Sequence, residues 1–497
     1  MFKILKRTSV LFLVSVLTLQ ACKQEDIIEL QPEFSLDAVK NPSTIAQVEQ
    51  VLDGAYANFR AADYYGSGSG TGGGAAMMPD VLSDNLYETT QTLANSRAMA
   101  DWTYQQNTAQ INNIYNAMYK VISVANIVLR DVDKFATAAN QKRINRIKGQ
   151  ALTIRALAHF DLFKYFANNY DRNSTTTLAL YYNKTFTVSA DEKPSRISNK
   201  LYYDELFADM TAAELLLSDV DMPVNNASLV TRPRLSITAL HVLRARVSLY
   251  AGLWAEAITA ANKGIATAPA LVSNQTTFSG MYNGGAAGET IWNVQFDAGQ
   301  SGPTFLVFFA TNNRSYFRPA LEVATAAGTT GLIQSNDIRY SAYFTAIPAT
   351  SLALTKYRGK GTVSDGNANF LAMKTGELYL IRAEAYGRNN QDVLGMNDLN
   401  TLRTARIANY VPQVLTGAAL QAAIADERRR ELIGEGHRFF DLKRTTRTIT
   451  RGSTCGNIAL SPAGKCTLAS TAREWTFPIP EAVTNANANM VQNPGWN

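Results

Sequence analysis

One segment near the middle of the chain limits the fold more than any other, because its pattern is that of two helices that pack closely. Residues 236–269 read SITALHVLRARVSLYAGLWAEAITAANKGIATAP, with a short break at Ala251-Gly252. Small residues recur on both sides of this break: Ala239, Ala245, Ala257 and Ala260. Small side chains allow two helices to approach, and a single hairpin does not bury its own apolar face. The segment therefore predicts helical hairpins that stack on one another.

A second segment, residues 378–406, has the same pattern and reads LYLIRAEAYGRNNQDVLGMNDLNTLRTAR. Apolar residues at three- and four-residue spacing predict four further helices, within residues 43–60, 111–135, 146–166 and 200–220. The two hairpins resemble tetratricopeptide repeats, which are helix-turn-helix units of about 34 residues. Because the repeats are degenerate, unrelated helices of an all-α domain are the alternative.

Two regions between the helical segments, residues 64–104 and 289–320, have a different composition. They are rich in aromatic residues and glycine, and the second also in β-branched residues. This composition is typical of short strands and irregular structure. The predicted fold class is therefore mainly α, a tetratricopeptide-like helical hairpin scaffold with loop-rich aromatic inserts and a few short strands.

The N-terminus has the pattern of a secretory signal, with basic residues at positions 3, 6 and 7 followed by SVLFLVSVLTL. This apolar run is shorter than the roughly 20 residues that span a membrane. Leu19 and Ala21 precede Cys22 in a way that resembles the recognition box of bacterial lipoproteins. The resemblance implies cleavage before Cys22 and acylation of that cysteine, palmitate being one such chain. Acyl chains would anchor the protein to a membrane without spanning it. An ordinary signal with an incidental cysteine is the alternative.

Lys23-Gln24-Glu25-Asp26 resembles the export signal that sends lipoproteins of the Bacteroidetes to the outer face of the outer membrane. We therefore expect a signal peptide over residues 1–21, a flexible tether over 22–40 and one domain over 41–497. Within that domain we expect a helical N-terminal part to about residue 270 and a C-terminal part from about residue 271.

The two cysteines that follow Cys22, Cys455 and Cys466, flank a loop-like segment. In an exported protein such a pair is predicted to form a local disulfide.

A basic stretch near the C-terminus, RRRELIGEGHRFFDLKR, covers residues 428–444. Its six basic residues face the carboxylates of Glu427, Glu431, Glu435 and Asp441, which nearly cancel its field; the spacing pairs Glu427 with Arg430 and Glu435 with Arg438. A nucleic-acid groove would not neutralise itself in this way. The net charge of the whole chain, only +6, also argues little for nucleic acid. We interpret the stretch as structural, with exposed pairs that each contribute about 0.2–0.5 kcal/mol.

The same stretch resembles the C-terminal signature of the SusD/RagB family. The pattern E-R-R-x-E-L…E-G-x-R-x-x-D-L-x-R falls on Glu427, Arg428, Arg429, Glu431, Leu432, Glu435, Gly436, Arg438, Asp441, Leu442 and Arg444. The final Gln492-Asn493-Pro494-Gly495-Trp496 is similar to the close of that family. Residues 148–167 resemble its early A-x-x-x-R-A-x-x-Y-F-x-L helix, with His159 where an aromatic residue is commoner.

This resemblance implies an outer-membrane lipoprotein, facing the cell exterior, that binds nutrient and passes it to a SusC-type TonB-dependent transporter. The ligand of such proteins is an oligosaccharide or, in some members, a peptide, as in RagB-like proteins. The resemblance implies no catalysis and no cofactor. A repeat scaffold that only docks proteins and a hydrolase are the alternatives from other classes.

Catalytic motifs are weak or absent in the sequence. The three histidines are scattered, and HExxH, GxSxG and GxxxxGK[ST] do not occur. Gly68, Gly70 and Gly73 formally match GxGxxG, but a Gly/Ser-rich run gives this match by chance. We therefore assign no catalytic residue and no metal ligand.

Sugar binding places apolar ring faces against aromatic side chains, while a few polar groups hold the hydroxyls. Exposed aromatic residues in the non-helical regions are thus the predicted ligand contacts. The candidates are Tyr64, Tyr65, Trp102, Trp292, Tyr316 and Arg318. Trp254, in contrast, lies within a hairpin and is predicted to belong to the core.

Overall fold

The computed structural model describes residues 41–187, 191–220, 232–300, 302–457 and 464–496. Its longer helices are α4 (Ile45–Asn58), α7 (Ala109–Asp131), α8 (Gln141–Phe166), α9 (Asn199–Leu217), α10 (Ile237–Tyr250), α11 (Trp254–Thr267), α12 (Gln275–Asn283), α14 (Thr375–Arg388), α15 (Asp392–Arg406) and α16 (Gly417–Leu432). Shorter helices are α5 (Met78–Val81), α6 (Arg97–Ala100), α13 (Ile338–Tyr343), α17 (Arg438–Arg444) and α18 (Glu481–Ala486).

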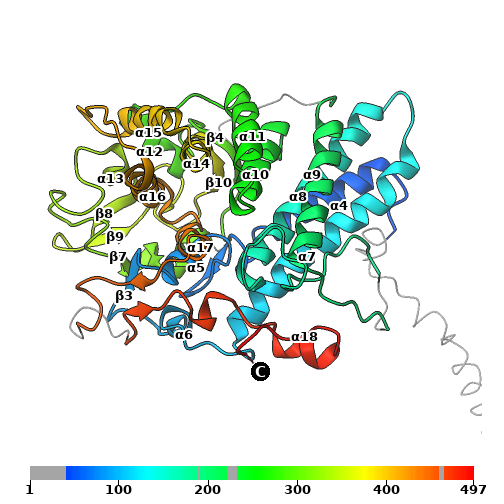
Figure 1. Ribbon diagram of the computed structural model, residues 1–497, viewed down its shortest axis with the longest axis horizontal. Coiled ribbons are helices and arrows are strands. Elements are labelled where there is room, and N and C mark those ends of the chain that lie inside the picture. The colour runs from blue at the N-terminus through cyan, green and yellow to red at the C-terminus, as the bar shows by residue number, and fades with distance from the viewer. Residues whose placement is uncertain (1–40, 188–190, 221–231, 301, 458–463, 497) are drawn as a thin grey trace, which may run out of the picture.

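The helices stack as antiparallel neighbours across the molecule. Helices α4, α7, α8 and α9 lie on one side, α10 and α11 lie in the middle, and α14, α15 and α16 lie on the other side (Figure 1). The helical hairpin turns where the sequence predicts it, at Ala251-Gly252 between α10 and α11, and Gly252 has a φ of 70°. Stacked helical hairpins are therefore confirmed as the scaffold.

Small residues and side-chain caps explain why the helices begin and pack where they do. Ser198 and Ser236 accept hydrogen bonds from backbone amides in the first turns of α9 and α10. A side chain in place of Gly149 would come within 2.7 Å of Leu217, so this glycine allows α8 and α9 to approach. Gly264 does the same between α11 and Leu378 on α14.

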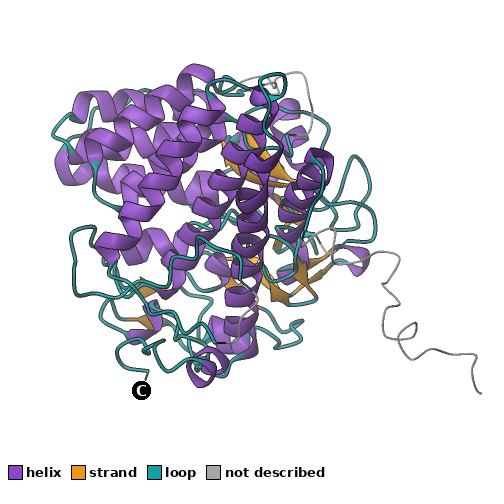
Figure 2. Ribbon diagram, turned by 90° about the vertical axis from the view of Figure 1, so that its right-hand side faces the viewer, coloured by secondary structure: helices purple, strands orange, loops and turns teal. Residues whose placement is uncertain are grey.

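The strands are short and pair in twos. They are β1 (Ser67–Gly68) with β2 (Thr71–Gly72), β3 (Leu86–Glu88) with β7 (Phe317–Pro319), β4 (Thr290–Val294) with β10 (Phe370–Lys374), β5 (Phe308–Phe309) with β6 (Arg314–Ser315), β8 (Phe344–Ala346) with β9 (Leu352–Leu354), and β11 (Ile449–Thr450) with β12 (Thr467–Leu468). Every one of these pairs is antiparallel. Figure 2 shows the strands as small pieces joined by loops, while helices form the bulk of the molecule. The predicted mainly α fold with a few short strands is confirmed.

Several sequence predictions concern residues that lie outside the described part of the chain. The signal peptide, Cys22 and the tether all fall within residues 1–40. Among the described residues, no helix is both long and apolar enough to cross a membrane.

The predicted disulfide is confirmed. Cys455 and Cys466 are bonded, with their Cα atoms 5.6 Å apart.

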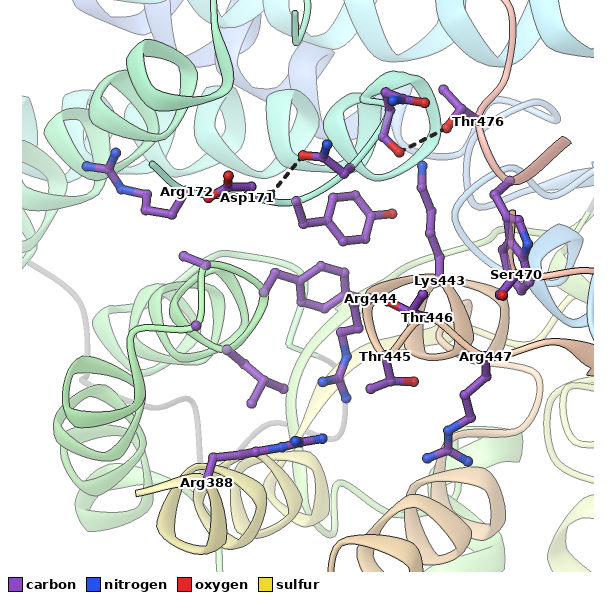
Figure 3. Close-up of a pocket in the computed structure, with 18 of the residues that line it drawn as sticks. Asp171, Arg172, Arg388, Lys443, Arg444, Thr445, Thr446, Arg447, Ser470 and Thr476 are labelled. Atoms are coloured by element: carbon purple, nitrogen blue, oxygen red, sulfur yellow. Dashed lines mark hydrogen bonds between the residues drawn. The ribbon is translucent and has the colours of Figure 1, made fainter. Parts of the chain in front are cut away.

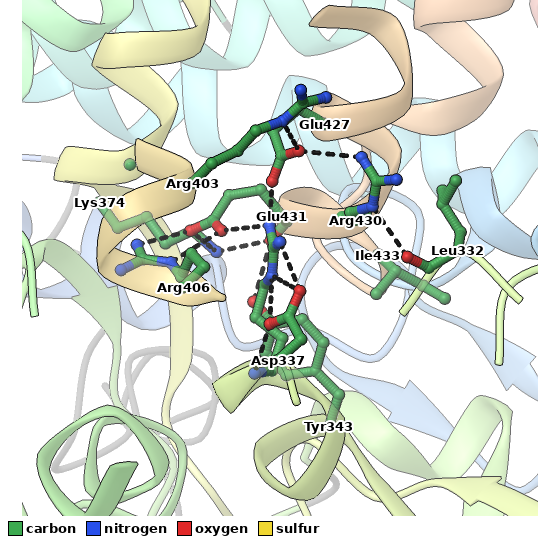
Figure 4. A network of polar contacts seen from close by, with 12 residues as sticks. Leu332, Asp337, Tyr343, Lys374, Arg403, Arg406, Glu427, Arg430, Glu431 and Ile433 are labelled. Carbon is green, nitrogen blue, oxygen red and sulfur yellow. Dashed lines mark hydrogen bonds and ion pairs between the residues drawn. The ribbon is translucent and has the colours of Figure 1, made fainter. Parts of the chain in front are cut away.

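The basic C-terminal stretch lies in a buried network of ion pairs (Figure 4). Glu431 on α16 contacts Arg406 of α15 at 3.0 Å and Arg339 of α13 at 3.1 Å. Glu427, one turn earlier, contacts Arg339 at 2.7 Å and Arg403 at 2.8 Å. The side chains of Arg339, Arg406, Glu427 and Glu431 are 0% exposed. The interpretation that this stretch is structural agrees with these contacts.

The expectation that its ion pairs are exposed is wrong, because the helix packs between other elements. Glu427 does contact Arg430, at 2.9 Å, but the Glu427 carboxylate is buried. Glu435 contacts Lys356 and Lys374 at 2.6 Å instead of Arg438. Burial alone would raise the pKa of Glu427, but Arg339, Arg430 and Arg403 lower it to about 2. The network therefore holds its carboxylates charged inside the protein.

We predict that Glu431→Gln lowers the free energy of unfolding by about 3–5 kcal/mol, because it removes the one buried carboxylate that Arg406 and Arg339 share. Urea unfolding followed by circular dichroism measures this change. Asp426→Asn is the matched control, since Asp426 is exposed on the same helix, and it should change stability by less than about 0.5 kcal/mol. Equal, small effects of the two substitutions would contradict a stabilising network.

Candidate functional site

The six predicted ligand contacts are buried. Fractional exposures are 0% for Tyr64, 3% for Tyr65, 1% for Trp102, 1% for Trp292, 3% for Tyr316 and 7% for Arg318. The prediction that these side chains are exposed in loops is therefore wrong. Their aromatic rings belong to the main core, which the inserts help to build.

Their polar atoms are also used inside the protein. The Tyr64 hydroxyl donates to Asp161 at 2.8 Å, and the Trp102 indole donates to the Leu82 carbonyl at 2.9 Å. Arg318 donates to the Leu352 carbonyl at 2.8 Å. Of the six, Trp292 borders a pocket, a shallow one of about 220 Å³ that Tyr56 and Arg234 also line.

Two half-buried rings do lie in the second insert. Phe305 and Phe309 have ring centroids 5.5 Å apart. Neither ring lines the larger cavity described next.

A cavity of about 730 Å³ lies where five separate segments meet (Figure 3). Its walls come from the loop after α8 (residues 168–173), the α10–α11 turn (249–254), the end of α14, the end of α17 with its following loop (443–447) and residues 470–476. Local backbone features open this space. Helix α10 ends at Tyr250, two residues before the left-handed Gly252, and Thr446, at a φ of 53°, turns the chain away after α17.

Aromatic rings form part of the wall. The rings of Tyr170 and Tyr250 lie 5.3 Å apart, and both side chains are largely buried. Trp254 is half-buried at the start of α11, next to Gly252. The prediction that Trp254 belongs to the core is thus only partly right, because its ring also lines the cavity.

Charged side chains form the rest of the wall. Arg444 makes two bonds to the Glu384 carboxylate, at 2.5 and 2.8 Å, and one ion pair to Asp441 at 2.8 Å. Lys443 donates to the carbonyls of Lys164 and Ala167 at 3.1 and 2.7 Å. Burial lowers the pKa of Lys443 well below its ordinary value.

The cavity combines concave shape, rings and hydrogen-bonding groups, which is the composition of a small-molecule site. None of the three histidines lines it. His159, for example, is buried against Tyr202, and burial lowers its pKa to about 3. Within the described residues, no group of three or more His, Cys, Asp or Glu side chains is placed to hold a metal ion.

Reasoning from sequence did not identify Tyr250 and Trp254 as site residues. One signal for them was present: both flank the Ala251-Gly252 break, so they lie at the end of a hairpin and not in its middle. Aromatic side chains at the end of a hairpin are less enclosed by neighbouring helices than those in its middle, so they can line a cavity.

Comparisons with known proteins agree with this architecture. A family model described as the SusD family matches residues 338–496, and one described as starch-binding associating with outer membrane matches residues 33–237. The SusD-like protein P38 of Formosa agariphila is 24% identical over 506 residues, covering 88% of this chain and 91% of that protein.

Solved structures share the fold. A SusD superfamily protein from Bacteroides thetaiotaomicron has a TM-score of 0.77 at 20% identity, covering 91% of this chain and 100% of that chain. A SusD-like carbohydrate binding protein from Bacteroides vulgatus has a TM-score of 0.73 at 20% identity, covering 90% of this chain and 97% of that chain.

The match over residues 338–496 includes the C-terminal signature that resembles this family, and the match over residues 33–237 covers most of the N-terminal helices. The chain belongs to the SusD/RagB family of outer-membrane-associated carbohydrate-binding proteins, which bind their ligands without catalysis.

Proposed function

We propose that this protein is a cell-surface lipoprotein that captures an oligosaccharide in the cavity between α8, the α10–α11 turn and α17. It then delivers the oligosaccharide unaltered to a SusC-type TonB-dependent transporter. The observation that carries this proposal is the cavity itself, which places a half-buried tryptophan beside many hydrogen-bonding side chains.

A sugar presents two kinds of surface to a protein. The C–H groups of a pyranose ring form an apolar face that packs on an aromatic ring, and Trp254 offers such a surface at the edge of the cavity. The hydroxyls need donors and acceptors, and the cavity lining offers them on Asn168 and Asn173 of one loop and on Thr445 of another.

Delivery and attachment are supported by the sequence. The box before Cys22 resembles that of lipoproteins, and the family likeness implies a SusC-type partner. Residues 22–40 would be long enough as a tether to hold the domain near the membrane, since an extended chain spans about 3.3–3.6 Å per residue.

We predict that Trp254→Ala weakens binding of the best-bound glycan by about 1–2 kcal/mol, because the ring loses its apolar contact with the sugar. The glycan is chosen from an array probed with the purified full chain, and calorimetry then gives the dissociation constants. Phe207→Ala is the control, because Phe207 is a half-buried ring on α9 that does not line the cavity. Equal affinities for wild type and the Trp254 variant would place the sugar elsewhere.

We predict that Cys22→Ala abolishes labelling of the protein by radioactive palmitate, since the thiol is the acceptor of the acyl chain. The variant should also leave the outer-membrane fraction, because acyl chains supply the hydrophobic free energy of anchoring. Fractionation of labelled cells measures both effects. An unlabelled variant that stays in the outer membrane would mean that another part of the protein attaches it.

A further inference from the structure

Basic side chains outnumber acidic ones in the cavity lining, and the binding of a neutral sugar does not require such an excess. The lining holds five basic side chains, namely Arg172, Arg388, Lys443, Arg444 and Arg447, and two carboxylates, Asp171 and Glu384. Even without Lys443, whose pKa burial lowers, four arginines face two carboxylates.

Three of the basic groups are satisfied by neighbouring protein atoms. Arg444 is paired with Glu384 and Asp441. Arg172 is paired with Asp204, which lies outside the cavity lining. Lys443 is held by two backbone carbonyls. These groups shape the wall and have little capacity left for a ligand.

Arg388 and Arg447 differ from the other three. Neither guanidinium makes an ion pair or a side-chain hydrogen bond within the described part of the chain. Arg388 is exposed at the end of α14, and Arg447 is half-buried after α17. Figure 3 shows Arg388 at the lower left and Arg447 at the lower right of the view, with Arg444 and Thr445 between them. All four also belong to the lining of a smaller neighbouring pocket, together with Glu384 and with Asp441, which is paired with Arg428 and Arg444.

The nearby carboxylates do not neutralise this pair. Glu384 is engaged by both terminal nitrogens of Arg444. Asp171 accepts a hydrogen bond from the Asn173 amide and, among the described residues, forms no ion pair with either arginine. The Arg388 and Arg447 guanidiniums therefore face the cavity with their charge uncompensated.

A guanidinium presents donors in a planar fork that matches the oxygens of a carboxylate or a sulfate. We propose that the cavity takes an acidic oligosaccharide, with Arg388 and Arg447 holding a carboxylate or sulfate group while Trp254 packs against the sugar. This inference rests on the proposed function of sugar capture and specifies the class of sugar.

The test compares two matched pairs of ligands, using calorimetry on the full chain purified in detergent. The first pair is a galacturonic acid oligosaccharide and its methyl ester. The second pair is a sulfated galactan oligosaccharide and its desulfated counterpart. We expect the acidic member of at least one pair to bind tenfold or more tightly than its neutral partner. This preference should shrink between 50 mM and 500 mM NaCl, about a tenfold rise in salt, because exposed charges are screened. The pair that shows the preference identifies the anion.

The variant Arg388→Gln/Arg447→Gln should lose about tenfold in affinity for the acidic ligand and keep its affinity for the neutral one. An unchanged melting temperature will show that the variant is folded. Lys120→Gln is the control for loss of positive charge, because Lys120 is exposed on α7 and does not line the cavity.

Each contrary outcome has its own meaning. Equal binding of acidic and neutral ligands overturns the acidic preference while sugar capture stands. An acidic preference that survives in the double variant overturns the assignment to Arg388 and Arg447. If none of the four binds but another glycan does, the acidic-ligand inference fails alone. If a glutamate-rich peptide binds and no glycan does, sugar capture fails with it.

Discussion

Buried ion pairs on α16 tie together the helices and strands of the C-terminal part of this structure. Glu431 joins α15 and α13 through Arg406 and Arg339, and Arg406 reaches on to Glu289 at 2.8 Å, just before β4. Charges taken out of water cost free energy unless each one is met by an opposite charge in good geometry. Here every member has such a partner, so the network fixes how the second hairpin sits against the strand-rich part.

The same signature also sets the position of the cavity. Arg428 on α16 contacts Asp441 on α17 at 3.0 Å, and Asp441 in turn contacts Arg444. Arg438 at the start of α17 contacts Asp84 at 2.7 Å, which ties that helix to the first insert. Helix α17 is thereby held in one orientation, and its end delivers Lys443, Arg444 and Arg447 to the cavity wall. A motif that is structural along most of its length thus builds one side of the proposed binding site.

Much of the fold was predictable from the sequence because helical hairpins carry their pattern locally. Ala239 and Ala257 mark two close-packed faces, and the Ala251-Gly252 break marks the turn between them. The exposure of loop residues has no such local signal. Tyr65 is buried because its ring meets Phe370 at 5.0 Å and Trp292 at 6.0 Å, and these partners are remote in sequence. In irregular segments the buried side chains have no regular spacing, so the sequence does not show which of them point into the core.

The cavity could not be predicted for the same reason, since its walls come from five separate segments. Arg388 and Arg447 lie 59 positions apart in the printed sequence, and only the packing of α14 beside α16 and α17 brings them to one space. A site that is assembled from residues so far apart in the sequence can be identified only in the folded structure. What the sequence did indicate was the class of protein, through motifs whose order and spacing are specific.

A crystal structure of the protein with a bound oligosaccharide tests sugar capture in this cavity most directly. We expect electron density for a sugar ring packed on Trp254, within the space bounded by Tyr250, Arg388 and Arg447. Density instead beside Phe305 and Phe309, with the cavity empty of sugar, would contradict it.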